Sequence, residues 1–112
     1  LLTNKNATVT IAHSKTSNLK SLCLSNEIII AAIGKANFLK KEWVKKNAVI
    51  IDVGINVIGQ EKGSRKIVGD VDYEDVHEKV SYISPVPGGV GPMTIHCLLS
   101  NTLSLAEIKA KS

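Results

Sequence analysis

Two short apolar runs, residues 27–33 and 48–53, constrain the fold of this 112-residue chain more than any other feature. Gly34 and Gly54 follow them directly, so each run stops at a residue that favours a turn. Continuous apolar runs of this length are typical of strands that are buried on both faces of a parallel sheet. Helical patterns lie around and between them, and this alternation predicts crossover units and an α/β fold.

The rest of the chain continues the alternation. The further elements that the pattern predicts are strands at residues 7–12 and 82–84 and helices at residues 17–25, 38–46, 72–79 and 92–108. Residues 56–66 carry two glycines among polar side chains, which favours a loop or a small hairpin. Trp43 is interpreted as a packing anchor and Asp72 as a helix N-cap. Apolar residues from Ile95 to Ala106 recur at helical spacing, so we expect the last helix to be amphipathic.

Composition indicates a single soluble domain. The chain is 44% hydrophobic, and no apolar run approaches the roughly 18 residues that a membrane helix needs. The net charge of +4 comes from scattered basic and acidic residues, and aromatic side chains are few and spread out, so we expect neither a nucleic-acid nor a membrane partner. Cys23 and Cys97 lie in apolar helical patterns without the spacing of metal ligands, and we expect reduced core thiols and no metal.

Residues 85–94 join the last predicted strand to the last predicted helix with the sequence PVPGGVGPMT. The prolines fix the path of the backbone, and the glycines let it approach a flat ligand closely. Pro92 suits the first turn of a helix, whose free N–H groups would face that ligand. The pattern favours a ligand-binding surface, although a stiff strand-to-helix connection uses the same residue types.

This segment and three others resemble the methylenetetrahydrofolate dehydrogenase/methenyltetrahydrofolate cyclohydrolase family. Residues 87–94 read PGGVGPMT, which is the signature of that family, without a break. Residues 7–16 (ATVTIAHSKT), 51–56 (IDVGIN) and 68–72 (VGDVD) resemble the family in the same order. The resemblance covers essentially the whole chain.

The resemblance implies a partial Rossmann-like parallel sheet with flanking helices and a long C-terminal helix. It assigns residues 1–112 to a truncated NAD(P)-binding domain. In the family, a first strand with a Gly-Arg-Ser-type phosphate turn precedes this part, and so does a folate domain with the Tyr and Lys catalytic motif. We therefore expect both to be missing here, and no residue of this chain to be catalytic, His77 and His96 included.

The first predicted loop at the carboxyl edge of the sheet contains His13, Ser14 and Lys15. An NAD-binding domain usually places Asp or Glu here to bind the ribose 2′-OH, and this loop has no carboxylate. A hydroxyl and a cation instead suit a 2′-phosphate, so the loop favours NADP over NAD. The resemblance implies that Ser14 contacts the phosphate, with His13 and Lys15 beside it. A polar loop that merely begins the next helix is the alternative.

Three further loops at this edge are candidates for ligand contact. Gly34 allows the backbone to approach the adenosine or pyrophosphate side. Ile55 follows the second buried strand and is placed beside the nicotinamide, whereas Asp52, inside that strand, is interpreted as structural.

Within the signature, the resemblance implies two groups of contacts. Pro87, Gly88 and Gly89 would lie against the folate, and Gly91 and Thr94 would lie near the nicotinamide.

The resemblance implies a parent enzyme that oxidises 5,10-methylenetetrahydrofolate with NADP⁺ and hydrolyses 5,10-methenyltetrahydrofolate to 10-formyltetrahydrofolate. The isolated chain is expected to be inactive. Tetrahydrofolate is the expected substrate and a homodimer through the cofactor domain the expected assembly. A cytoplasmic location is expected, with a mitochondrion or plastid left open. The alternative is a cofactor-domain remnant that acts only in dimerisation or regulation.

Overall fold

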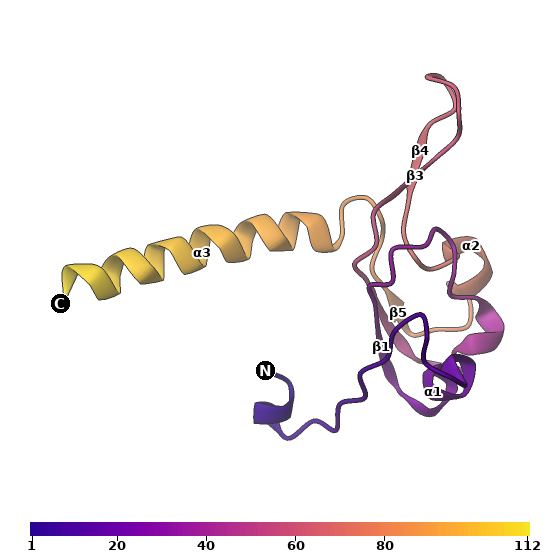
Figure 1. Cartoon of the computed structure of the whole chain (residues 1–112), viewed down its shortest axis with the longest axis horizontal. Helices are drawn as coiled ribbons and strands as arrows, with labels where there is room; N and C mark the ends of the chain where they lie inside the picture. The colour runs from indigo at the N-terminus through magenta and orange to yellow at the C-terminus, as the bar shows by residue number, and fades with distance from the viewer.

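A three-stranded parallel sheet forms the centre of the chain in this computed structural model, which describes residues 1–112. Its order is β1 (Ile28–Ala31), β2 (Val49–Asp52) and β5 (Tyr82–Ile83). Figure 1 shows the sheet and the short helices gathered in one body, from which a hairpin and a long helix project in different directions. The α/β fold with a parallel sheet and a long C-terminal helix is confirmed.

Strand β2 is the middle strand of the sheet and pairs with both of the other strands. Its Val49 is paired with Ile28 of β1 and with Tyr82 of β5. Ile50 is fully buried, as expected for a continuous apolar strand that is covered on both sides. Because all three strands run the same way, their carboxyl ends meet at one edge of the sheet.

The hydrophobic core lies between the sheet and the segments that cover one face of it. It consists of five buried side chains, namely Leu39, Val44, Ile50, Val71 and Val76. Trp43 packs against this cluster and meets Phe38 edge to face, with ring centroids 5.2 Å apart. The interpretation of Trp43 as a packing anchor is therefore confirmed.

The predicted strand at residues 7–12 is wrong for this chain. These residues belong to no strand, and residues 8–12 make no backbone–backbone hydrogen bond. A strand forms only where a neighbour can pair with it. The neighbouring edge here is β1, and it is unpaired on its outer side, with Ile28 62% and Ile30 53% exposed. The expectation that the strand at residues 27–33 is buried on both faces is therefore also wrong.

The helices are shorter than predicted. Helix α1 spans Leu19–Ser25 and begins late because Asn18 adopts a left-handed conformation with φ 57°. Residues 38–46 form only the 3₁₀ turn η2 (Lys41–Trp43), since Leu39 bridges in parallel to Val71 instead of entering a helix. A second 3₁₀ turn, η1, spans Thr3–Lys5.

Helix α2 (Tyr73–Val76) confirms the predicted N-cap. The Asp72 carboxylate accepts a hydrogen bond from the backbone N–H of Asp75. The helix ends well before residue 79, and its last residue, Val76, is buried in the core.

Two elements project from the body. Strands β3 (Asn56–Ile58) and β4 (Lys66–Val68) form an antiparallel hairpin, which confirms the hairpin expected within residues 56–66. Helix α3 (Val90–Ala110) extends away from the sheet in Figure 1, and every residue from Gly91 to Ala110 is exposed. The Cys97 thiol is therefore exposed, and its prediction as a core thiol is wrong.

The apolar residues of α3 are not confined to one stripe. Met93 and Ile95 are both exposed and lie about 200° apart around the helix axis. The expected amphipathic pattern is therefore weak. A helix that crosses a membrane would need to be more apolar over a greater length than any helix of this structure.

The ion pair between Lys40 and Asp72 makes stability depend on pH. The two side chains are joined by a 2.7 Å contact from Nζ to Oδ2, and this hydrogen bond holds the pKa of the Asp72 carboxyl below its usual range. A lowered folded-state pKa stabilises the fold at pH values above the unfolded pKa, about 4, and this contribution is lost as pH falls through the folded value.

We predict that Asp72→Asn, which keeps an N-cap side chain but removes the charge, lowers the free energy of unfolding by about 0.5–1 kcal/mol at pH 7. The difference from the unsubstituted chain should shrink at a second, acidic pH below the lowered folded-state pKa, because the carboxyl is then protonated in both states. Urea unfolding at the two pH values measures it. An equal difference at both values would contradict the assignment.

Candidate functional site

The candidate site is the edge where the carboxyl ends of β1, β2 and β5 meet. In parallel α/β sheets, ligands bind in the crevice outside this edge. Two carboxylates lie just beneath it, with Asp52 3% exposed and Asp70 fully buried. Neither takes part in an ion pair. Their charges are instead met by N–H donors, as buried carboxylates require.

Asp52 joins β2 to the chain that returns from the hairpin. Its Oδ1 accepts hydrogen bonds from the backbone N–H groups of Gly54 (2.9 Å) and Asp70 (3.0 Å), and its Oδ2 accepts one from Val71 (3.0 Å). Its own N–H donates to Ser84 Oγ at 2.7 Å, which ties the end of β2 to the end of β5. The interpretation of Asp52 as structural is confirmed.

Asp70 joins two loops at the edge. Its Oδ2 accepts hydrogen bonds from the backbone N–H groups of Ile33 (2.7 Å) and Gly34 (2.8 Å), directly after β1. Its Oδ1 accepts one from Asn56 Nδ2 (2.8 Å), at the start of β3. Sequence reasoning missed this residue.

Two glycines make room for the two carboxylates. A Cβ on Gly54 would overlap the Asp70 carboxylate, and a Cβ on Gly69 would overlap the Asp52 carboxylate. The segments IDVG and VGD therefore interlock, because each carboxylate packs over the glycine of the other segment. We call these four residues the Asp–Gly interlock. Both segments were noticed in the sequence because they resemble the family, but the number of residues between them does not indicate that they contact each other.

Two of the predicted cofactor residues, Gly34 and Ile55, follow strands β1 and β2 at this edge. Gly34 has φ 75°, is exposed, and has open space where a Cβ would be. Its N–H donates to the Asp70 carboxylate, however, and is therefore not free to bind a ligand. Ile55 is 69% exposed at the end of β2, as a side chain that packs on a ligand would be.

Residues His13, Ser14 and Lys15 form a closed turn. The His13 N–H donates to Thr16 Oγ1 at 2.9 Å, and the Thr16 N–H donates to the His13 carbonyl at 2.9 Å. The Lys15 N–H donates to His13 Nδ1 at 3.2 Å, so Nδ1 is an acceptor and Nε2 carries the ring proton. The side chains of His13, Ser14 and Lys15 are all exposed.

The signature leads from β5 into α3. Gly88 has φ 95°, and a Cβ on Gly89 would overlap the Pro85 carbonyl, so both glycines are required by this path. The Val86–Pro87 peptide bond is cis. Pro87 and Gly88 are exposed and Gly89 is half-buried.

Helix α3 begins at Val90, which confirms that Pro92 lies in its first turn. The Thr94 hydroxyl donates to the Val90 carbonyl at 3.1 Å, and Gly91 is exposed in the same turn. The Thr94 oxygen therefore remains available to a ligand as an acceptor.

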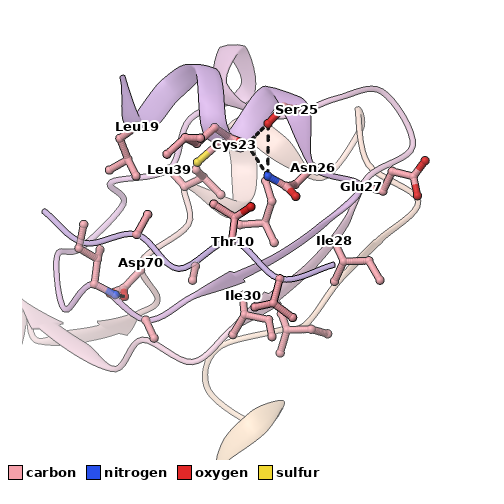
Figure 2. Close-up of a pocket in the computed structure, with 18 of the residues that line it drawn as sticks. Thr10, Leu19, Cys23, Ser25, Asn26, Glu27, Ile28, Ile30, Leu39 and Asp70 are labelled. Carbon is pink, nitrogen blue, oxygen red and sulfur yellow. Dashed lines mark hydrogen bonds between the residues drawn. The ribbon is translucent and has the colours of Figure 1, made fainter. Parts of the chain in front are cut away.

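A groove of about 950 Å³ runs between residues 7–14, helix α1 and strand β1, and His13 and Ser14 lie at its border. Figure 2 shows Thr10 between the helix side, where Leu19 and Cys23 lie, and the strand side, where Ile28 and Ile30 lie, with Asp70 at one end. The lining is mainly apolar. Cys23 is half-buried here, and burial raises the pKa of its thiol, which suits an unreactive packing role.

We predict that Gly69→Ala lowers the free energy of unfolding by about 2 kcal/mol, because the new Cβ would displace the Asp52 carboxylate from its donors. Gly63→Ala is the matched control, since a Cβ there meets no atom within 4 Å. Urea unfolding of both variants measures the difference. An unfolding free energy in Gly69→Ala equal to that of the control would refute the close packing.

Residues 1–110 match the family described as the NAD(P)-binding domain of tetrahydrofolate dehydrogenase/cyclohydrolase. The bifunctional protein FolD of Bartonella tribocorum is 57% identical over 109 residues, which are 95% of this chain and 36% of that protein.

Solved structures agree in fold. The bifunctional dehydrogenase/cyclohydrolase of Thermoplasma acidophilum has a TM-score of 0.91 at 42% identity, over 99% of this chain and 39% of that one. The enzyme of Trypanosoma brucei, solved in complex with NADP cofactor and an inhibitor, has a TM-score of 0.89 at 35% identity, over 99% of this chain and 39% of that one. The chain therefore spans somewhat over a third of the length of these relatives. It belongs to the tetrahydrofolate dehydrogenase/cyclohydrolase family and matches that family's NAD(P)-binding domain.

Proposed function

We propose that this chain is the cofactor-binding part of a bifunctional enzyme. The enzyme oxidises 5,10-methylenetetrahydrofolate with NADP⁺ and hydrolyses 5,10-methenyltetrahydrofolate to 10-formyltetrahydrofolate. The observation that carries the proposal is the single edge at which the ends of β1, β2 and β5 meet, because the Gly34 loop, the Ile55 loop and the signature follow these neighbouring strands. Parallel sheets bind dinucleotides at such an edge.

NADP is the proposed cofactor. The turn at residues 13–16 presents the Ser14 hydroxyl, the Lys15 ammonium and the His13 Nε2–H to solvent, and it contains no carboxylate. This donor set fits a 2′-phosphate and lacks the acceptor that a ribose 2′-OH would need. The NADP in the Trypanosoma brucei complex supports the same choice.

The remaining predicted residues orient the two reactants. Bound NADP⁺ would supply the hydride acceptor. Ile55 packs on the nicotinamide, Gly34 approaches the adenosine side with its open Cα side, and Gly91 and Thr94 face the nicotinamide from the first turn of α3. Pro87, Gly88 and Gly89 form the wall against the folate. Alignment of this kind accelerates a transfer by holding the reacting atoms close, at about 3–3.5 Å.

We further propose that residues 1–112 are a truncated domain and that the groove receives a strand from the preceding part of the polypeptide. Both walls of the groove lack backbone partners, since residues 8–12 are unpaired and the outer edge of β1 is free. A strand between them would satisfy both. The relatives are longer than this chain, which covers 36% and 39% of two of them, so they contain further segments that could supply such a strand.

A homodimer and a cytoplasmic location complete the proposal. The exposed apolar side chains of the projecting helix α3 and of the hairpin, Val57 and Ile67 among them, favour a packed assembly over an isolated chain. The same surfaces favour the second candidate function, a remnant that acts in dimerisation or regulation. Two free cysteines suit a reducing compartment.

The cofactor proposal is tested in a chimera, in which this chain follows the upstream part of the Bartonella tribocorum relative. We predict that Ser14→Asp weakens NADP⁺ binding by about tenfold or more and NAD⁺ binding far less, because a carboxylate repels the 2′-phosphate. Calorimetric titration measures both affinities. The control is Ser21→Asp, which adds the same charge at an exposed position of α1. Equal losses for both nucleotides would count against an NADP site, and a dimer that binds neither nucleotide would favour the remnant.

The strand proposal is tested with Ile30→Lys. In the 112-residue chain the side chain is half exposed, so we predict a change in unfolding free energy below about 0.5 kcal/mol. In the chimera the added strand would bury the lysine, and the predicted loss is about 2 kcal/mol or more. Tyr73→Lys, at an exposed position of α2, is the control and should cost the same in both proteins. If Ile30→Lys barely changes the unfolding free energy of the chimera, the proposed strand in the groove is wrong.

A further inference from the structure

We infer that Asp70 is a positioning residue, whose carboxylate sets the spacing between the Gly34 loop and the loop from Gly54 to Asn56. This inference rests on the proposed function, since these are two of the loops that would hold the cofactor. Asp70 is fully buried and therefore does not touch a ligand itself. It acts through the two loops that it joins.

The carboxylate reaches both loops at once. Its Oδ2 receives the consecutive N–H groups of Ile33 and Gly34, at 2.7 and 2.8 Å, and its Oδ1 receives Asn56 Nδ2 at 2.8 Å. The first loop follows β1 and the second follows β2, which are adjacent strands. Hydrogen bonds to a charged acceptor are about twice as strong as neutral ones, so one side chain can hold both loops.

The backbone of Asp70 is itself fixed by hydrogen bonds to Asp52 and Leu39. Its N–H donates to Asp52 Oδ1 at 3.0 Å, and its carbonyl accepts from the Leu39 N–H at 2.9 Å. Its carboxylate occupies the space where a Cβ of Gly54 would lie. The Asp–Gly interlock thus fixes the carboxylate, and the carboxylate fixes the loops.

The arrangement also restricts how the Gly34 loop meets a nucleotide. Both N–H groups of Ile33 and Gly34 are used by Asp70, so neither can donate to the pyrophosphate. Gly34 is open on its Cα side, since nothing lies within 4 Å of the position that a Cβ would take. The loop would therefore present a flat surface to the nucleotide, and the position of that surface depends on the hydrogen bonds to Asp70.

Three variants separate positioning from simple stability. Asp70→Ser removes both arms of the tie. Asn56→Ala removes only the arm to the second loop. Val76→Ala is the matched control, because it removes a fully buried core side chain on α2 without touching either loop. Asp70→Asn is the conservative variant, since its oxygen can still accept from Ile33 and Gly34, and a rotated Asn56 amide can accept from its NH₂.

The first readout is amide hydrogen exchange of Ile33 and Gly34 in the 112-residue chain, measured by NMR under native conditions. We expect exchange at these two amides about tenfold faster, relative to the core amides, in Asp70→Ser, and no such selective change in Val76→Ala. Asp70→Asn should restore most of the protection. Exchange that rises uniformly across the core in Asp70→Ser, as in the control, would overturn the tie.

The second readout is NADP⁺ affinity of the chimera by calorimetry, at a temperature where every variant is folded. We expect Asp70→Ser to weaken binding by about tenfold, Asn56→Ala by less, and Val76→Ala to bind as the unsubstituted protein does. Selective exchange with unchanged affinity would overturn the positioning role. If the unsubstituted chimera binds no NADP⁺, the proposed function fails, and the tie between the loops is then decided by the exchange result.

Discussion

The Asp–Gly interlock is the interaction on which the rest of this structure depends. Asp52 and Asp70 come from segments that are far apart in the sequence, and each carboxylate lies against the glycine of the other segment. Together they collect backbone donors from the ends of β1 and β2 and from the chain that leaves the hairpin. Leaving either carboxylate without these donors would bury an uncompensated charge, so the loops at the carboxyl edge are held in one arrangement.

Local sequence patterns predicted the central strand, the hairpin and the last helix, and they failed for residues 7–12, which have no pairing neighbour, and for residues 38–46, where Leu39 bridges to Val71 instead of entering a helix. The central strand β2, the hairpin and the Asp72 N-cap follow from apolar runs, glycines and side-chain chemistry that act over a few residues. Residues 7–12 have strong strand propensity, yet no neighbour pairs with them, and propensity alone does not form a strand. Helix α3 shows the converse, because its apolar residues have nothing to pack on and remain exposed.

The site was predictable as a set of loops and not as a set of contacts. The resemblance pointed to Ser14 and Thr94, the absence of a side chain pointed to Gly34, and the parallel sheet brings the loops after its strands to one edge. Neither line of reasoning could show that the Gly34 N–H is already used by Asp70, since that bond joins residues 36 positions apart. Asp70 itself was missed because a buried aspartate with no cation nearby leaves no local signal in a sequence.

The most direct measurement of the central claim is a crystal structure of the chimera with NADP⁺ bound. The account predicts the 2′-phosphate at the turn of residues 13–16 and the nicotinamide between Ile55 and the first turn of α3. It also predicts that Asp70 stays buried and still bonded to the Ile33 and Gly34 amides beneath the nucleotide. A nucleotide that lies along residues 8–12 and the outer edge of β1, or one that draws the Gly34 N–H away from Asp70, would contradict it.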